Sequence, residues 1–241
     1  MSVTINCEAM LERFFESLVN GDRPGARTVV ARAKEAGLDS ERMILELFWP
    51  TYQKLEKLQR ADQISTMSHH MATRLLRVLI DQCAASMQRT ESRGRTILAF
   101  CGASEHEELG AQMAVDVLEA AGYDVCFAGG GIANDEIIAR ASETKPDVLL
   151  MFASAASDLP NIRALIDTVR ELAACPDMQV AVGAGVFNRA DGLAEEIGAD
   201  LWAKDPIELA QVLIEEPSRK ADSLQRTVGK SRTKPTGKKA A

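Results

Sequence analysis

The residues with the most capacity for chemistry stand between Gly102 and Gly110, where one of the chain's three histidines is flanked by glutamates. His106 offers an imidazole, a neutral nitrogen ligand that suits transition metals. Glu105 and Glu107 offer carboxylates, which accept hydrogen bonds and prefer harder cations. The stretch lies between a predicted strand and a predicted helix, and open α/β sheets bind ligands at the carboxyl ends of their strands. We therefore take it as the first candidate site, although a histidine at the start of a helix is often a plain surface residue.

Small residues also follow three further predicted strands. They are Gly129-Gly130-Gly131 after the second, Ala153-Ser154-Ala155-Ala156-Ser157-Asp158 after the third, and Gly183-Ala184-Gly185 after the fourth. Glycine lets a ligand approach the backbone closely. One such loop is ordinary in a tight turn, but four at one edge of a sheet favour a binding slot. The candidate binding residues are Gly110, Ser154, Ser157, Gly183, Ala184 and Gly185.

From residue 95 onward, short apolar runs alternate with amphipathic stretches. Strands are predicted at 96–101, 123–128, 147–152, 178–183 and 200–203, and helices at 107–121, 134–144, 160–173, 190–197 and 206–215. The first run, Thr-Ile-Leu-Ala-Phe-Cys, carries no charge, which is typical of a strand covered on both faces. This alternation predicts an α/β domain over 95–215 with right-handed crossovers. Its doubly wound parallel sheet has five strands in a flavodoxin-like, Rossmann-like order.

The first 88 residues predict a different unit, a four-helix bundle with short connections. Its helices are expected at 6–20, at about 22–36, from 39 or 40 onward with a bend at Pro50, and at about 62–87. In the fourth helix the apolar spacing predicts an inward face: Ile64, Met67, Met71, Leu75, Val78 and Leu79. A polar linker, 88–95, joins this bundle to the sheet, so the bundle is available to cover the strand ends.

Composition limits the function classes. The net charge is −7 over the chain and +7 over 217–241, which leaves −14 for the body. We expect 216–241 to be a disordered basic tail, and nucleic acid to bind weakly through it or not at all. No apolar run is long enough to cross a membrane, and the start lacks the pattern of a secretory signal. The five cysteines form no CxxC pair, which is typical of a reduced, cytoplasmic protein.

The residue pattern also disfavours a free-standing enzyme. It contains no nucleophile–base–orienter set, no cluster of metal-chelating histidines and cysteines, and no phosphate-binding glycine loop. The stretch 198–206 resembles the last strand of phosphoacceptor receiver domains, with Lys204 at their lysine position. Those domains need an aspartate after the third strand, where this chain has Phe152-Ala153-Ser154, so we do not favour that interpretation.

A helical bundle followed by this α/β domain resembles the cobalamin-binding module of corrinoid proteins. That family includes methionine synthase, methyltransferase corrinoid proteins and B12-dependent light-sensing repressors. Its signature is Asp-x-His-x-x-Gly, then Ser-x-Leu, then Gly-Gly, on the first, third and fourth strand-end loops. The resemblance covers roughly residues 5–215 and is strongest in the layout and in the stretches 182–189 and 197–200.

The first motif departs from the family pattern. Anchored on Gly110, the resemblance puts Glu105 at the Asp position and Glu107 at the position of the axial cobalt ligand, while His106 falls one residue early. A carboxylate there can hydrogen-bond to an axial water or amide, so the cobalamin would keep its own benzimidazole or a water as ligand. Alternatively, a one-residue bulge lets His106 reach the metal. Ser-x-Leu corresponds to Ser154 or Ser157, and Gly-Gly to Gly183-Ala184.

The fourth helix carries a second resemblance. Ser-His-His-Met-Ala-Thr at 68–73 is similar to the Glu-His-x-Ala-Thr stretch of the light-sensing repressors, which would place His70 over the upper face of the corrin and His69 at the Glu position. Adjacent helix positions point about 100° apart, so only one of the two faces inward. His70 shares a face with Met67 and Arg74, which we expect near the buried side. The tryptophan of that family would fall at Gln59 and is missing.

The resemblance implies a cobalamin cofactor and a function exercised through a protein partner. We favour a sensor or regulator. The alternative is a corrinoid methyl carrier that serves a separate methyltransferase, and the absence of a histidine at Glu107 weighs against it. A third possibility is a degenerate fold that binds no corrin and works as an interaction module. Nothing in the sequence predicts the oligomeric state.

Overall fold

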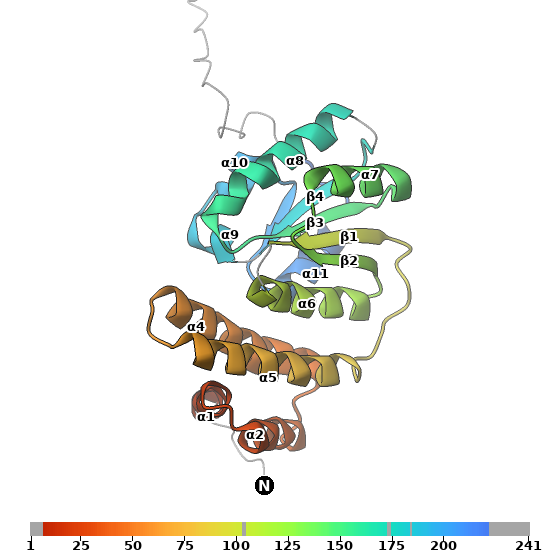
Figure 1. Cartoon of the computed structure of the whole chain (residues 1–241). Helices are drawn as coiled ribbons and strands as arrows, with labels where there is room; N and C mark the ends of the chain where they lie inside the picture. Colours follow the sequence, from red (N-terminus) through yellow and green to blue (C-terminus); the bar gives the residue numbers. More distant parts are fainter. Residues whose placement is uncertain (1–6, 103–104, 173–174, 184, 222–241) are drawn as a thin grey trace, which may run out of the picture.

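The computed structural model describes residues 7–102, 105–172, 175–183 and 185–221. A helical cap, α1–α5, lies against one side of an α/β domain, with α5 and α4 next to α6 (Figure 1). The side chains of Glu105 and His106 lie outside this description, as does Ala184.

The cap helices follow the predicted order. They are α1 (Cys7–Val19), α2 (Arg23–Glu35), α3 (Ser40–Met43), the π-helical η1 (Ile44–Phe48), α4 (Trp49–Arg60) and α5 (Thr66–Ala84). Asp22 caps α2 and Ser65 caps α5 through side-chain oxygens that accept backbone N–H groups. The bend expected at Pro50 takes the form of η1 directly before it, because a wider turn accommodates a residue that cannot donate a backbone hydrogen bond.

The α/β domain contains a five-stranded parallel sheet in the order β2-β1-β3-β4-β5, which confirms the predicted doubly wound topology. Its strands are β1 (Thr96–Cys101), β2 (Asp124–Gly130), β3 (Val148–Phe152), β4 (Gln179–Gly183) and β5 (Leu201–Ala203). Its helices are α6 (Glu105–Ala120), α7 (Asn134–Thr144), η2 (Ala156–Asp158), α8 (Leu159–Leu172), α9 (Gly185–Arg189), α10 (Leu193–Ile197) and α11 (Pro206–Glu215).

Strand register brings the loops of interest together. Cys101 is paired with Phe152, Phe152 with Gly183, and Gly183 with Ala203, so four strands end in one row. We call this row and the loops that follow it the carboxyl edge. The order reverses direction between β1 and β3, which is where ligands bind in sheets of this type.

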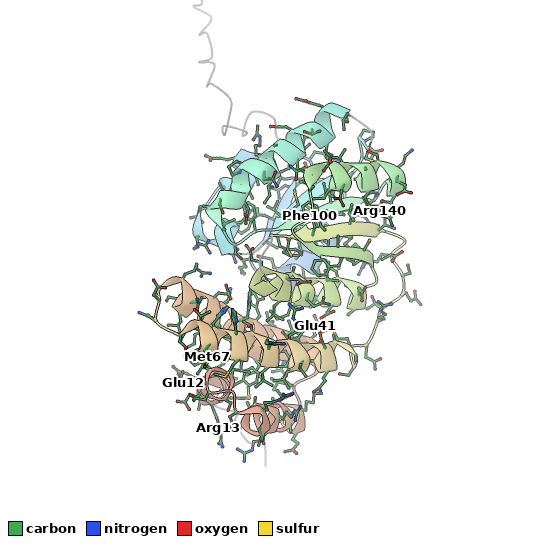
Figure 2. All side chains as sticks on the ribbon, in the orientation of Figure 1. Glu12, Arg13, Glu41, Met67, Phe100 and Arg140 are labelled. Atoms are coloured by element: carbon green, nitrogen blue, oxygen red, sulfur yellow. The ribbon has the colours of Figure 1, made fainter. Side chains whose placement is uncertain are left out.

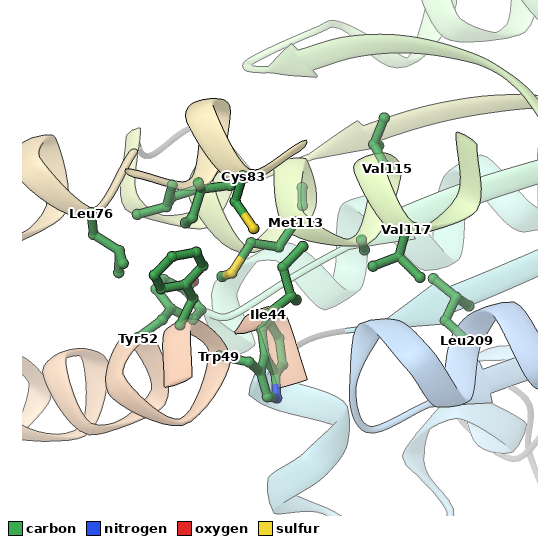
Figure 3. Packing of buried hydrophobic residues seen from close by; sticks show 14 of the residues in the cluster. Ile44, Trp49, Tyr52, Leu76, Cys83, Met113, Val115, Val117 and Leu209 are labelled. Atoms are coloured by element: carbon green, nitrogen blue, oxygen red, sulfur yellow. The ribbon is translucent and has the colours of Figure 1, made fainter. Parts of the chain in front are cut away.

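The two faces of the sheet bury different sets of residues. Odd-numbered positions of β1, such as Ile97 and Ala99, pack with α6, α11 and the cap, whereas Leu98 and Phe100 pack with α7 and α8. Figure 2 shows Phe100 on the sheet and Met67 on the outer part of the cap. Because cap, α6 and α11 share one apolar core, the cap is an integral layer of the structure (Figure 3).

Two local predictions are wrong. The helix expected at 190–197 begins only at Leu193, as α10, because Gly192 before it has a left-handed φ of +77°, and a short helix that was not predicted, α9, precedes it at 185–189. Met67 and Met71, both expected to face inward, are 73% and 37% exposed. The inner side of α5 is instead lined by Ala72, Leu75, Leu76, Leu79, Ile80 and Cys83.

The beginning of the basic tail is ordered, contrary to the prediction of disorder from residue 217. Lys220 Nζ donates to the carbonyl oxygens of Asp177 and Met178 at 2.9 and 2.8 Å, and the Ala221 amide donates to Asp200 Oδ1 at 2.6 Å. These contacts hold 219–221 against the amino edge of the sheet. The remaining tail residues, 222–241, lie outside the described residues.

Candidate functional site

Glu107 is the central charged residue at the carboxyl edge. It lies in the first turn of α6 and is only 6% exposed. Its Oε1 accepts a hydrogen bond from the Ser154 amide at 2.7 Å, which ties the start of α6 to the loop after β3. A side chain on Gly102 would overlap this carboxylate, so the glycine after β1 is what allows the buried position. The glutamate thus links two of the loops that the sequence singled out.

The surroundings of Glu107 are apolar and negatively charged. Burial, with Glu108 and Glu107 nearby, raises the pKa of the Cys101 thiol to about 12. Burial and then Glu107 raise the pKa of Asp158 above its usual range. Both groups are therefore held in their neutral forms more strongly than in water. A negative site of this kind favours ligand groups that donate hydrogen bonds.

The cap supplies an aromatic pair that packs against α6 beside this edge. A Cβ atom on Gly110 would lie 2.8–3.0 Å from the hydroxyl and ring of Tyr52, so the glycine in α6 makes room for α4. Trp49, one turn earlier, has its ring centroid 5.5 Å from that of Tyr52 and is 7% exposed. Burial, with the carboxylates of Glu56 and Glu107, raises the pKa of Tyr52. Gly110 is therefore one of the positions at which the cap and the α/β domain are in close contact.

His69, and not His70, is the histidine that faces inward. His69 is 3% exposed, and its Nε2 lies 2.9 Å from Oε1 of Glu56, which is itself 5% exposed. The expected burial of the His70 side of α5 is therefore wrong. His70 is exposed and lies two turns before Arg77, whose Nη2 is 3.7 Å from Oε2 of Glu108 on α6. His70 shares that side of α5, and its role toward a cofactor stays a prediction.

The loop after β3 is held by hydrogen bonds to two other elements, α6 and α9. Arg189 of α9 donates from Nη2 to the carbonyl oxygen of Ser154, whose amide is already bound to Glu107. Gly185 lets the arginine pass, since a Cβ there would lie 2.8 Å from Arg189 Nη1. Ser154 is half-buried and Ser157 is exposed. Of the two serines proposed for the same role, Ser154 is the one built into the edge.

Of the three candidates in the first motif, the structure describes the side chain of Glu107 but not those of Glu105 and His106. The backbone is helical from Glu105 onward, while residues 103 and 104 before it lie outside the described residues, so the bulge considered for His106 stays a prediction. Glu107 is the residue whose carboxylate reaches the carboxyl edge. Whether Glu105 or His106 contacts a ligand stays a prediction. Gly183 is buried at the end of β4, and Ala184 lies outside the described residues.

Two buried oxygens at this end of the molecule have no hydrogen-bond partner among the described residues. They are Oδ2 of Asp158, in the loop after β3, and Oε1 of Gln59, at the end of α4. Buried acceptors are normally satisfied, so each is suited to a donor that a ligand brings. Amide groups are such donors.

The sequence analysis missed Tyr52, Glu56 and Arg189. Tyr52 and Glu56 are four residues apart on α4, a spacing that puts them on one face, but their partners come from other elements. Among the described residues, no group of three or more His, Cys, Asp or Glu side chains is arranged to hold a metal ion. The described helices include none that is long and apolar enough to span a membrane.

A cavity of about 710 Å³ lies away from the carboxyl edge. It is bounded by the end of α2, the segment 86–93, the last turn of α6 and the outer side of α11. Because α6 is 16 residues long, its two ends are about 24 Å apart. The cavity is therefore separate from the site around Glu107.

Family models account for both parts of the chain. One described as a B12 binding domain matches residues 95–210, and a second with the same description matches residues 10–84. The first corresponds to the sheet and its helices and the second to the cap. Together they cover most of the chain.

Relatives and a solved structure are similar along the same regions. The chain is 29% identical over 131 residues to a corrinoid protein of Desulfitobacterium hafniense (strain Y51), covering 53% of this chain but only 59% of that relative's length. It is 19% identical over 213 residues to monomethylamine corrinoid protein 1 of Methanosarcina mazei, covering 86% and 97%. The structure of the Methanosarcina barkeri monomethylamine corrinoid protein has a TM-score of 0.76 at 18% identity, covering 86% and 98%, which shows a shared fold.

Proposed function

This chain belongs to the B12-binding domain proteins, and from that premise we propose that it holds a corrinoid at the carboxyl edge, between the sheet and the cap, and acts through a protein partner. The observation that carries the proposal is Glu107. It is a buried carboxylate at the switch point of the sheet, held by the Ser154 amide in a niche left by Gly102.

The residues of this edge fit the rim of a corrinoid. A corrin ring carries amide side chains, and the unpartnered oxygens of Asp158 and Gln59 are acceptors of the type that amide N–H groups need. Exposed Ser157 and half-buried Ser154 add hydroxyl groups in the same loop as Asp158. When bound, a cobalamin would supply a cobalt centre able to exchange axial ligands and carry an alkyl group.

The role we assign to Glu107 is that of a hydrogen-bonding group below the corrin. A carboxylate is a poorer partner than imidazole for cobalt and a better acceptor for a water or an amide. His106 and His70 remain our candidates for a protein nitrogen ligand below and above the ring. The absence of a histidine at position 107 favours a sensor or regulator over a methyl carrier, because a histidine is usual at this position in the methyl carriers that the chain resembles.

A second candidate function is the methyl carrier itself. It is favoured by the alignments that span 97% and 98% of two monomethylamine corrinoid proteins. The two functions differ in one measurable property. A carrier loaded with methylcobalamin loses its methyl group to an acceptor when a corrinoid methyltransferase is added, whereas a sensor keeps it.

Binding is tested with the full chain and hydroxocobalamin, by absorption spectroscopy after desalting. We expect retention of close to one corrinoid per chain. Glu107→Gln should weaken binding about fivefold, because a charge-assisted hydrogen bond to the Ser154 amide is replaced by a neutral one. Glu108→Gln is the matched control, since this neighbour is bound to Arg77 on the cap, and it should stay within about twofold. A folded chain that retains no corrinoid would refute the proposal.

A further inference from the structure

The space beneath the carboxyl edge, between α6, α11 and the sheet, is almost completely filled. Only about 10 Å³ remains there, bounded chiefly by Trp49, Ala114, Phe152, Gly183, Ala203 and Leu209. That volume is about enough for a single water molecule. The described residues thus leave no room for a ring system inside this layer.

Two aromatic side chains fill the space. The Phe152 ring lies across Gly183, close enough that a Cβ on the glycine would be 3.3 Å from two ring carbons. Trp49 enters from the cap and closes the side that faces α4. Phe152 is 5% exposed and Trp49 is 7% exposed, so both belong to the shared core. Opening the space would expose or displace both rings, and a close-packed interior resists such a change.

The nucleotide tail of a cobalamin is too large for the space that remains beneath the carboxyl edge. A cobalamin consists of a corrin ring and a nucleotide tail that ends in dimethylbenzimidazole. A cavity of about 150 Å³ is known to take up benzene, and dimethylbenzimidazole is larger than benzene. The available 10 Å³ is smaller by more than an order of magnitude. The corrin rim fits the edge, but the tail does not fit below it.

We infer that this chain binds its corrinoid with the nucleotide tail outside the protein interior. Phe152 and Trp49 keep the tail out, because their rings fill the space that it would need. The inference rests on the proposed function, because it concerns how the same ligand is held. It also gives the glycine at 183 a different role from the one suggested by the sequence. Gly183 accommodates the Phe152 ring rather than a ligand.

The first test compares two ligands on the unaltered chain. Cobinamide has the same corrin ring as cobalamin but lacks the nucleotide. A tail that lies outside contributes little, so we expect dissociation constants within about threefold of each other. A preference for cobalamin of tenfold or more would overturn the inference while leaving the proposed function intact. If neither ligand binds, the proposed function fails and the inference fails with it.

The second test opens the space. Phe152→Ala removes the ring that covers Gly183, and the variant should now prefer cobalamin over cobinamide by about tenfold or more. Phe100→Ala is the matched control, because Phe100 is equally buried but packs on the opposite face of the sheet. In Phe100→Ala the dissociation constants for cobalamin and cobinamide should stay within about threefold of each other. An unchanged preference in folded Phe152→Ala would overturn the role of Phe152, and if that variant does not fold, Trp49→Ala provides the same comparison.

Discussion

The two adjacent histidines of α5 allow a direct test of how the cap is built. His69→Ala removes the imidazole whose Nε2 lies 2.9 Å from Glu56 Oε1, in a pair with both side chains less than 10% exposed. Loss of one partner from a buried hydrogen bond costs about 1–3 kcal/mol, because the polar group left in the interior loses that bond without regaining water. Arg60 Nη1, 3.9 Å from the other Glu56 oxygen, offsets part of that cost. We therefore expect the free energy of unfolding to fall by about 2 kcal/mol.

The assay is urea denaturation of the full chain, with His70→Ala as the control. His70 is exposed, so its replacement should change the free energy of unfolding by no more than about 0.5 kcal/mol. Equal effects of the two substitutions would refute the assignment of His69 as the inner histidine. A double-mutant cycle with Glu56→Ala isolates the pair, because alanine cannot accept the hydrogen bond, and a coupling energy near zero would show that the loss comes from packing alone.

Three further predictions follow from individual contacts. Burial raises the pKa of Asp116 to about 6 from 3.8, so the folded state prefers the neutral acid and loses stability as the pH rises between these values. Asp116→Asn should therefore raise the free energy of unfolding by about 1 kcal/mol at pH 7, allowing for partial exposure, and should leave it unchanged below pH about 4. Gly110→Ala should cost about 1–2 kcal/mol in urea denaturation through its clash with Tyr52, and Tyr52→Leu should relieve it if that contact is the cause. Truncation after Ala221 should leave the Tm unchanged, whereas truncation after Glu216 should lower it by a few degrees; identical Tm values for the two would contradict the contacts of the ordered tail.

The α/β domain was predictable because its signals are local. Uncharged apolar runs marked β1 and β3, and the helix expected at 206–215 matches α11 at both ends. Helix α7 matched its expected bounds throughout. Doubly wound order then followed from the alternation of strands and helices.

The site was less predictable because its geometry depends on contacts between distant segments. The pattern of α5 was compatible with either histidine inside, and only the packing of Leu76 and Ile80 against neighbouring helices selects His69. The residues that fill the space below the edge, Trp49 and Phe152, are separated by about a hundred positions, so no local pattern links them. Glu107 was identified from its spacing to Gly110, but its bond to the Ser154 amide needed the register of β1 and β3.

The tie between the end of α11 and the amino edge of the sheet has a practical consequence. Gln179 Nε2 donates to the carbonyl oxygens of Glu216 and Arg219, so the chain leaves its described part at Ala221 beside the starts of β4 and β5. The site around Glu107 is at the opposite ends of those strands. A label attached at Ala221 would therefore report on the amino edge of the sheet without touching the site around Glu107.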